Sequence, residues 1–308
     1  MTTIALTGAT GFVGRRVISL LLEQGHSVRA LARPGRTLPG HEKLIRVSGT
    51  LADQNSLNAL VRDCEAVIHI AAATSGFDYD DLAQTNVSGS GHLLDAIVST
   101  APQARLVHVS SLAAREPQLS DYAASKRAGE ELVSTSAIHW LIIRPPAIYG
   151  PQDPALAPLW RMLARGWLPR MGPRQARFSL LHVDDLASAL VSAAVNGWPK
   201  PVMINLHDGH RDGYSWPEIA EIAARVRRGR VRMIKVPQAL LRVAGATNLF
   251  VARFRRSRPP VLVPNKVAEL VHPDWVCDNT DLPGCPDWRP TRMLKDSLMT
   301  LPGWKRFQ

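Results

Sequence analysis

Three glycines near the N-terminus, Gly8, Gly11 and Gly14, constrain what this chain can fold into more than any other feature. They lie between an apolar run, Ile4–Leu6, and a segment with helical character, Phe12–Gln24. A strand that turns sharply into a helix needs a residue without a Cβ, and a pyrophosphate reaches the backbone only where no side chain intervenes. The helix N-terminus then offers unpaired N–H groups and a partial positive charge to phosphate. The pattern predicts a nucleotide-binding βα unit.

Strand-like and helix-like segments alternate over the first half of the chain. Apolar runs typical of strands are Ile4–Leu6, Ser27–Leu31, Leu44–Val47, Ala66–Ile70, Arg105–Val109 and Trp140–Arg144, and helical segments are Gly14–Gln24, Ser56–Val61, Leu82–Thr100 and Tyr122–Ser134. This rhythm predicts parallel βαβ units, and therefore an α/β fold with a doubly wound parallel sheet of Rossmann type. Ligands of such sheets lie beyond the carboxyl ends of the strands.

A smaller C-terminal lobe is expected beside the sheet. We assign residues 1–150 to a dinucleotide-binding core to which residues 178–206 return, and residues 151–177 and 207–308 to a substrate-binding lobe. The division rests on the prolines that interrupt the pattern after Gly150 and on its return at Val183–Asn196 and Val202–Leu206.

Three further elements are expected in the lobe: a helix at Trp216–Val226, a strand at Val231–Val236 and a helix at Ala239–Phe254. Arg242 and Arg253 interrupt the last segment, which is too short to span a bilayer. We interpret it as a core helix. The alternatives are a helix on a membrane surface and a roof over an apolar substrate pocket.

The chain is basic, with a formal net charge of +11 at pH 7, and its arginines cluster. The two clusters are Arg227, Arg228, Arg230 and Arg232, and Arg253, Arg255, Arg256 and Arg258. They indicate an anionic partner: a phosphorylated cofactor, an acidic substrate or the headgroups of a membrane. A solvated basic face that favours solubility is an equally weighted alternative. We do not expect nucleic acid as a partner, because no recognition module accompanies the arginines.

The N-terminus and the cysteines favour a cytoplasmic protein, with membrane association as an option. The first strand begins without a basic and apolar leader, so we expect no secretion signal. Cys64, Cys277 and Cys285 have neither zinc spacing nor the pattern of a disulfide framework. We therefore expect no metal site and a reducing compartment.

Tyr122 and Lys126 form the strongest catalytic candidate. They are four residues apart in a helical segment, so their side chains share one face. An ammonium near a phenol stabilises the phenolate and lowers the phenol pKa from about 10 toward working pH, which suits a proton donor to a carbonyl oxygen. Ser110 and Ser111 end the strand before this helix, where a hydroxyl can hold a substrate oxygen.

Together these motifs resemble the extended short-chain dehydrogenase/reductase family, also called NAD-dependent epimerase/dehydratases. The matching segments are Thr7–Gly14, Ile68–Ala72, Asn86–Gly89, Val109–Ser111, Tyr122–Lys126, Arg144–Pro145, Tyr149–Pro151 and His182–Ala187, and Asp287–Pro290 leads to the family's closing helix. The resemblance covers the whole chain. It implies a Rossmann core that binds a nicotinamide dinucleotide.

The resemblance also assigns roles to residues. Tyr122 would be the acid/base, Lys126 would tune it and hold the nicotinamide ribose, Ser111 would orient the substrate oxygen, and Asn86 belongs with these catalytic residues. The residues expected at the cofactor are Gly8, Thr10, Gly11, Phe12, Val13, Gly14, Arg33, Arg36, Thr50, Leu51, Ala71, Ala72, Ala73, Tyr122, Lys126 and Pro145. Family members are often dimers, so a homodimer is one option.

The end of the second strand favours NADP(H) over NAD(H). Pockets that prefer NAD usually carry an acid there, and this chain has Ala32, followed by Arg33 and Arg36. A guanidinium pairs with a 2′-phosphate that an acid would repel. The alternative is that both arginines are exposed loop residues. Thr50 replaces the family's adenine-contacting acid, while Asp53 is interpreted as a helix cap.

The substrate is expected to be a small molecule, and two positions weaken the nucleotide-sugar alternative. Where family members that bind sugar nucleotides carry Asn and Arg toward the diphosphate, this chain has Ala147 and Phe178. The resemblance then favours an oxidoreductase that reduces a carbonyl, or oxidises an alcohol, on a hydrophobic and lipid-like substrate. A nucleotide-sugar epimerase or dehydratase and a non-catalytic accessory subunit like those of complex I are the alternatives. His182 and Asp184 are interpreted as structural.

Overall fold

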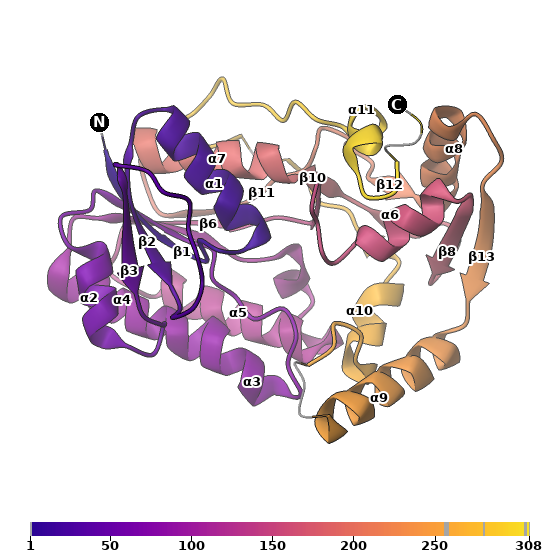
Figure 1. The fold of residues 1–308 in the computed structure, drawn as a ribbon, viewed down its shortest axis with the longest axis horizontal. Helices are drawn as coiled ribbons and strands as arrows, with labels where there is room; N and C mark the ends of the chain where they lie inside the picture. The colour runs from indigo at the N-terminus through magenta and orange to yellow at the C-terminus, as the bar shows by residue number, and fades with distance from the viewer. Residues whose placement is uncertain (1, 256–258, 280, 305–306, 308) are drawn as a thin grey trace.

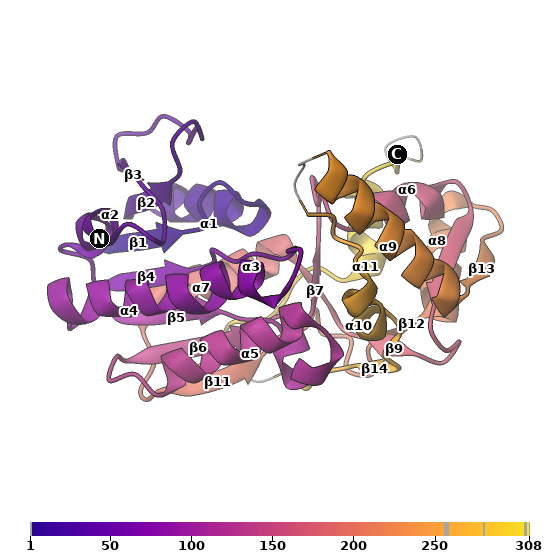
Figure 2. The ribbon, with the colours of Figure 1, turned by 90° about the horizontal axis from the view of Figure 1, so that it is seen from below.

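A computed structural model describes residues 2–255, 259–279, 281–304 and 307 of this chain. Its centre is a parallel sheet of seven strands in the order β11-β6-β5-β4-β1-β2-β3 (Figure 2). The strands are β1 (Thr3–Thr7), β2 (Ser27–Ala32), β3 (Leu44–Ser48), β4 (Ala66–His69), β5 (Arg105–Val109), β6 (Trp140–Arg144) and β11 (Val202–Asn205). The order reverses between β1 and β4, which confirms the doubly wound Rossmann-type sheet.

Two helices cover one face of the sheet and three cover the other (Figure 1). Residues of α1 (Phe12–Glu23) and α7 (Val183–Asn196) pack in one cluster, and those of α2 (Gln54–Val61), α4 (Gly89–Thr100) and α5 (Asp121–Ser134) in the second. Both faces are buried because the strands are apolar throughout: Leu141 and Ile143 point into the first cluster and Ile142 into the second.

The segment expected as one helix, Leu82–Thr100, is divided in the structure. A short helix, α3 (Tyr79–Ala83), leads into a π-helical turn, η1 (Gln84–Ser88), which continues as α4. Glycines let this region pack closely, since a Cβ on Gly129 of α5 would lie 2.5 Å from the carbonyl oxygen of Asn86. The π-helical turn positions Asn86 against α5.

A smaller lobe forms around a third apolar cluster, which includes Trp160, Tyr214, Trp216 and Trp304. It contains α6 (Ala157–Ala164), α8 (Trp216–Arg227), α11 (Leu294–Ser297) and the paired strands β8 (Trp167–Met171) and β13 (Arg232–Val236). The short strands are β7 (Ala147–Tyr149), β9 (Arg177–Phe178), β10 (Leu180–His182), β12 (Tyr214–Ser215) and β14 (Asp274–Trp275), and the 3-10 turns are η2 (Leu112–Arg115), η3 (Pro117–Leu119), η4 (Pro264–Lys266) and η5 (Leu298–Thr300). We retain the division at residues 150, 177 and 206 as a proposal; Leu282 and Cys285, further on, pack with the sheet.

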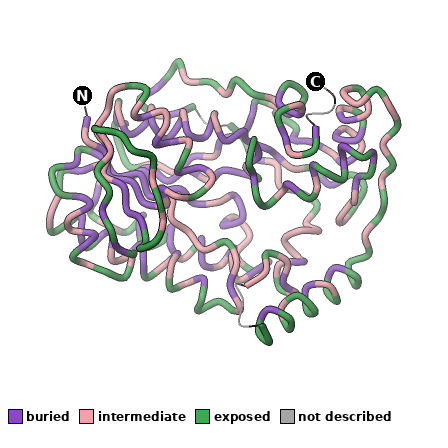
Figure 3. The backbone as a smooth tube through the Cα atoms, viewed as in Figure 1, coloured by how far each residue is buried: buried purple, intermediate pink, exposed green. Residues whose placement is uncertain are grey.

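Helix α9 (Gln238–Phe254) is not the core helix that its composition suggests. Its buried residues are Leu241, Gly245 and Ala252, and most of the rest of its surface is exposed or half-buried (Figure 3). It packs on η4 and α10 (Val267–Val271) at the edge of the lobe (Figure 1). None of the described helices is both long and apolar enough to cross a bilayer.

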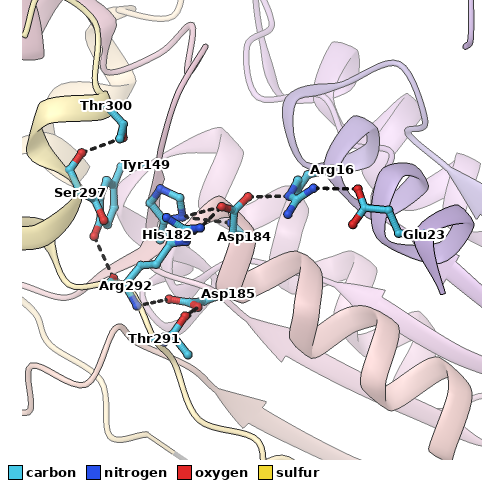
Figure 4. Close-up of polar contacts among 10 residues, drawn as sticks. All are labelled: Arg16, Glu23, Tyr149, His182, Asp184, Asp185, Thr291, Arg292, Ser297 and Thr300. Atoms are coloured by element: carbon cyan, nitrogen blue, oxygen red, sulfur yellow. Dashed lines mark hydrogen bonds and ion pairs between the residues drawn. The ribbon is translucent and has the colours of Figure 1, made fainter. Parts of the chain in front are cut away.

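A polar clasp ties the C-terminal segment to the sheet domain (Figure 4). Asp184 pairs with Arg16 of α1 at 2.6 Å and with Arg292 at 3.1 Å. Asp185 accepts hydrogen bonds from the backbone of Thr291 and Arg292, both at 3.0 Å. His182 caps α7 by accepting from the Asp184 N–H. These contacts support the structural interpretation of His182 and Asp184.

Candidate active site

The turn after β1 brings two backbone segments into close contact. Gly8 has a φ of +75°, and a Cβ there would lie 2.7 Å from the Ala71 nitrogen. A Cβ on Gly14 would lie 2.1 Å from the carbonyl oxygen of Gly8. Both positions therefore require glycine for conformation or close approach. Together they place the N-terminus of α1 beside the end of β4.

The N-terminus of α1 fits the phosphates of a dinucleotide. Gly11 occupies the N-cap position, and among the described residues no side chain caps the helix. The first turn contains no acid. Thr10 and Phe12 are half-buried there and Val13 is buried, so the backbone N–H groups remain the donors for an anion.

The ends of β2 and β3 carry the residues expected at the adenosine. Arg33 is exposed, Arg36 is half-buried, and a turn joins them, with the Arg36 N–H donating to the Arg33 carbonyl at 3.1 Å. Arg46 of β3 donates from Nη2 to the same carbonyl at 3.4 Å, which brings a third guanidinium to this turn. No pattern in the sequence points to Arg46 beyond its charge. Asp53 caps α2, as expected.

Thr50, Leu51 and the three alanines that follow β4 line the adjoining edge of the sheet. Thr50 is exposed, and its hydroxyl accepts from the Ala52 N–H at 3.3 Å. Leu51 is half-buried, and its carbonyl contacts His92 at 2.9 Å. Ala71, Ala72 and Ala73 are half-buried, so part of their surface stays open.

Asn86 holds the end of β4 against α5. Its Oδ1 accepts from the Ala73 N–H at 2.8 Å, and its Nδ2 donates to the Ala73 carbonyl and to the Ser125 hydroxyl, both at 2.9 Å. The side chain is buried, so each of these bonds replaces one to water. Asn86 fixes the segment 71–73 relative to the helix that carries Tyr122.

Lys126 is buried one turn after Tyr122, where its ammonium donates to the Val109 carbonyl at 2.9 Å. Burial lowers its pKa to about 8, and the nearby carboxylate of Glu130 opposes that shift. Glu130 is itself buried in a bidentate pair with Arg144 of β6, at 2.5 and 2.7 Å. Pro145 follows β6, and its carbonyl accepts from the Leu112 N–H at 2.8 Å.

The pKa of Tyr122 moves in the direction opposite to the expectation. Burial raises it to about 12, a hydrogen bond with Ser111 lowers it by less, and the carboxylate of Glu269 raises it further. The expected lowering by Lys126 is not found: burial dominates, and Lys126, whose ammonium donates to the Val109 carbonyl, is not among the groups that shift this pKa. Ser111, half-buried, thus contacts Tyr122, whereas the buried Ser110 hydroxyl has no partner among the described residues.

The C-terminal lobe brings two charged residues to Tyr122 that the sequence did not reveal. The Lys266 ammonium lies 4.4 Å from the centre of the Tyr122 ring. Glu269 accepts from the hydroxyl of Ser120, the N-cap of α5, at 2.7 Å, and Asn265 contacts Asp121 of the same helix. These residues lie more than a hundred positions along the chain from α5, so no local pattern connects them.

Positions 147 and 178, where sugar-nucleotide enzymes of the family carry Asn and Arg, hold apolar side chains here. Phe178 packs against Trp216, with ring centres 5.0 Å apart, inside the smaller lobe. Ala147 is exposed. Arg177, the residue before Phe178, donates to the carbonyls of Asp212 and Gly213 at 3.1 and 3.2 Å.

Comparison with known proteins agrees with this architecture. The profile of the NAD dependent epimerase/dehydratase family matches residues 4–206. The Bordetella bronchiseptica enzyme WbmH in complex with NAD+ is 20% identical and superposes with a TM-score of 0.68 over 99% of this chain and 98% of that one. At that identity the likeness concerns the fold.

Two curated relatives extend over most of the chain. Ceramide reductase of Caulobacter vibrioides is 36% identical over 274 residues, which is 88% of this chain and 85% of that protein. The mitochondrial NADH dehydrogenase [ubiquinone] 1 alpha subcomplex subunit 9 of Arabidopsis thaliana is 26% identical over 291 residues, 88% of this chain and 70% of that protein. The chain is therefore similar both to an enzyme and to a subunit of a larger complex.

Proposed function

This chain belongs to the NAD-dependent epimerase/dehydratase family, and we propose that it reduces a carbonyl group on a hydrophobic, lipid-like substrate with NADPH. It is an NAD(P)-dependent oxidoreductase of the short-chain dehydrogenase/reductase type. The observation that carries the proposal is the placement of Tyr122, which is bonded to Ser111 and lies one helical turn before the buried Lys126. The reverse reaction, oxidation of the alcohol, uses the same groups.

The chain's own residues supply the cofactor site. Gly8, Gly11 and Gly14 with the N-terminus of α1 would hold the pyrophosphate, and Thr10, Phe12, Val13 and Ala71–Ala73 would border it. Lys126 and Pro145 would lie at the nicotinamide end. The bound dinucleotide supplies the hydride. Arg33 and Arg36 would pair with a 2′-phosphate, with Thr50 and Leu51 beside the base, and this is the basis for preferring NADP(H).

Tyr122 would give its proton to the substrate oxygen. A phenol with its pKa near 12 is protonated at neutral pH, which is the state that reduction needs. The Ser111 hydroxyl would hold the same oxygen by hydrogen bond, and Asn86 would keep the adjoining backbone in place. The products balance as one hydride on the carbonyl carbon and one proton on its oxygen.

Two observations support an apolar substrate. The side chains at 147 and 178, alanine and phenylalanine, give no polar group to a diphosphate, and the Phe178 ring packs against Trp216. The relative from Caulobacter vibrioides is a ceramide reductase, whose name indicates a lipid substrate. We propose a 3-oxo-lipid, of the oxo-ceramide type, as the substrate class, and a reducing cytoplasm as the compartment because Cys64, Cys277 and Cys285 are free and buried.

The decisive experiment follows NADPH oxidation with a panel of long-chain 3-oxo amides and esters, in wild type and Tyr122→Phe. We expect the variant to lose turnover by about 10²–10⁴-fold because the proton donor is gone. The thermal shift on adding NADPH should persist. Tyr79→Phe, at an exposed tyrosine of α3, is the matched control and should retain activity. Full activity in Tyr122→Phe would refute the assignment.

The two alternatives predict different behaviour. A nucleotide-sugar epimerase or dehydratase retains its cofactor and turns over without added NADPH. An accessory subunit, the interpretation that the similarity to the Arabidopsis thaliana protein supports, binds the dinucleotide without turnover and co-purifies with a membrane complex. Turnover that depends on added NADPH excludes both.

A further inference from the structure

Helix α9 presents an apolar stripe to solvent. The exposed fractions are 57% for Leu240, 62% for Val243, 71% for Phe250 and 82% for Phe254. With Thr247 these residues recur at intervals of three and four, so they lie along one face of the helix. Exposed phenylalanines in a row are unusual on a protein surface that contacts only water.

The opposite face of α9 explains why the stripe remains outside. Gly245 packs so closely on the segment before α10 that a Cβ there would lie 3.0 Å from both the Val263 carbonyl carbon and the Pro264 nitrogen. Leu241 and Ala252 are buried on this same inner side. The helix therefore has a fixed inner face, and its apolar outer face is a property of the folded chain.

The segment that contains the stripe is cationic. Residues 222–268 contain twelve arginines and lysines and no aspartate or glutamate: Arg225, Arg227, Arg228, Arg230, Arg232, Lys235, Arg242, Arg253, Arg255, Arg256, Arg258 and Lys266. Arg242 and Arg255 are exposed on or directly after the helix, and Arg253 stacks 5.7 Å from the Phe77 ring. Arg256 and Arg258 lie outside the described residues. An apolar helix face with exposed arginines on and directly after the same helix complements an anionic lipid headgroup layer.

We propose that α9 docks this protein on the surface of an anionic lipid bilayer, with Val243, Phe250 and Phe254 in the acyl boundary and Arg242 and Arg255 at the headgroups. A second copy of the chain is the competing occupant. Pairing two α9 helices would bring two cationic segments together without an acid in either to compensate them.

Along the chain, α9 comes shortly before the lobe residues that contact the active site. Leaving α9, the chain passes Val263 to η4, whose Lys266 lies over the Tyr122 ring, and to α10, whose Glu269 bonds the N-cap of the catalytic helix. Docking at α9 would thus bring η4 and α10, which carry Lys266 and Glu269, close to the membrane. The inference goes beyond the proposed reaction and does not depend on turnover.

The first test is co-sedimentation of the full chain with vesicles of phosphatidylcholine alone or with phosphatidylglycerol. We expect binding to the anionic vesicles that weakens as salt is raised. Phe250→Ser/Phe254→Ser should lower the partition coefficient at least about tenfold because two aromatic side chains no longer leave water. The matched control is Ile45→Ser/Val98→Ser, at residues 50% and 56% exposed on the sheet domain, and it should bind as wild type does.

A second test uses a site-specific label on α9, so that it does not depend on a variant losing vesicle binding. The native cysteines are buried, so a polarity-sensitive dye would label Val243→Cys, with Val98→Cys as control. Anionic vesicles should shift the emission to the blue only for Val243→Cys. The proposal is overturned if Phe250→Ser/Phe254→Ser binds the vesicles as well as wild type does, or if binding does not depend on lipid charge. A blue shift that follows dimer formation in the absence of lipid would also overturn it. NADPH binding by thermal shift, measured on the same samples, reports separately on the cofactor site.

Discussion

The two sides of Tyr122 differ in how deeply their polar groups are buried. On the side of the sheet, Asn86, Lys126 and Glu130 are at most 3% exposed, and each has a hydrogen-bond partner. On the side of the lobe, the side chains of Lys266 and Glu269 are 14% exposed and lie 3.8 Å apart, and they are followed outward by the exposed stripe of α9.

This difference indicates a division of labour within one site. Buried, fully bonded groups are costly to change and hold their geometry, so they suit the proton chemistry that every substrate needs. Groups that are partly exposed cost less to change, and they suit contacts with a particular substrate. The sheet side should therefore tolerate substitution poorly and the lobe side well.

The largest effect is expected from Glu130→Gln. The substitution breaks the bidentate pair with Arg144 and leaves a mostly buried guanidinium without its counter-ion, which costs about 3–5 kcal/mol of the free energy of unfolding. Glu131→Gln, one residue later, removes the exposed pair with Arg127 and should cost about 0.5 kcal/mol or less. Urea unfolding of the two variants checks the contrast, and equal costs would break the comparison.

The pH dependence of the free energy of unfolding should report the lowered pKa of the buried Lys126. Its pKa is near 8 in the folded chain and returns to its ordinary value of 10.5 on unfolding. Between these values the unfolded chain holds a proton that the folded chain has released, so stability rises with pH. Lys126→Met should lack a rise of roughly 2 kcal/mol between pH 8 and 10, below the range where Tyr122 titrates. Parallel slopes in wild type and variant, from urea unfolding at each pH, would contradict the buried charge.

The difference between the sheet side and the lobe side also explains which features could be predicted from the sequence. The strands β5 and β6 have the predicted bounds, because a strand buried on both faces is a continuous apolar run. The glycine turn was predictable because only glycine fits it. In the lobe, Lys266 meets Tyr122 through a contact between distant segments, and α9 was misread because its apolar residues surround the helix and the burial of one face depends on what packs there. The pKa of Tyr122 was mispredicted because its burial, which raises this pKa, has no signature in the spacing of Tyr122 and Lys126.

The preference for NADPH over NADH tests Arg33 and Arg36, which lie in an exposed turn on the sheet side. Arg33→Ala/Arg36→Ala should raise the Kd for NADPH about tenfold and leave the Kd for NADH unchanged, because only NADPH carries the 2′-phosphate that a guanidinium pairs with. Arg15→Ala, at an exposed arginine of α1, is the control. Isothermal titration measures both cofactors, and equal losses for NADPH and NADH would show that the arginines do not select between them.

The smallest effect is expected from Lys266→Met. An ammonium over an aromatic ring contributes about 0.5–1 kcal/mol at a partly exposed site, so the substitution should change kcat/KM by about two- to fivefold. The stability should change little, since the pair with Glu269 is loose at 3.8 Å. Lys235→Met, at an exposed lysine of β13, serves as control. If Lys266→Met abolished turnover as Tyr122→Phe does, Lys266 would be part of the catalytic set. The lobe would then contribute to the chemistry as well as to substrate recognition.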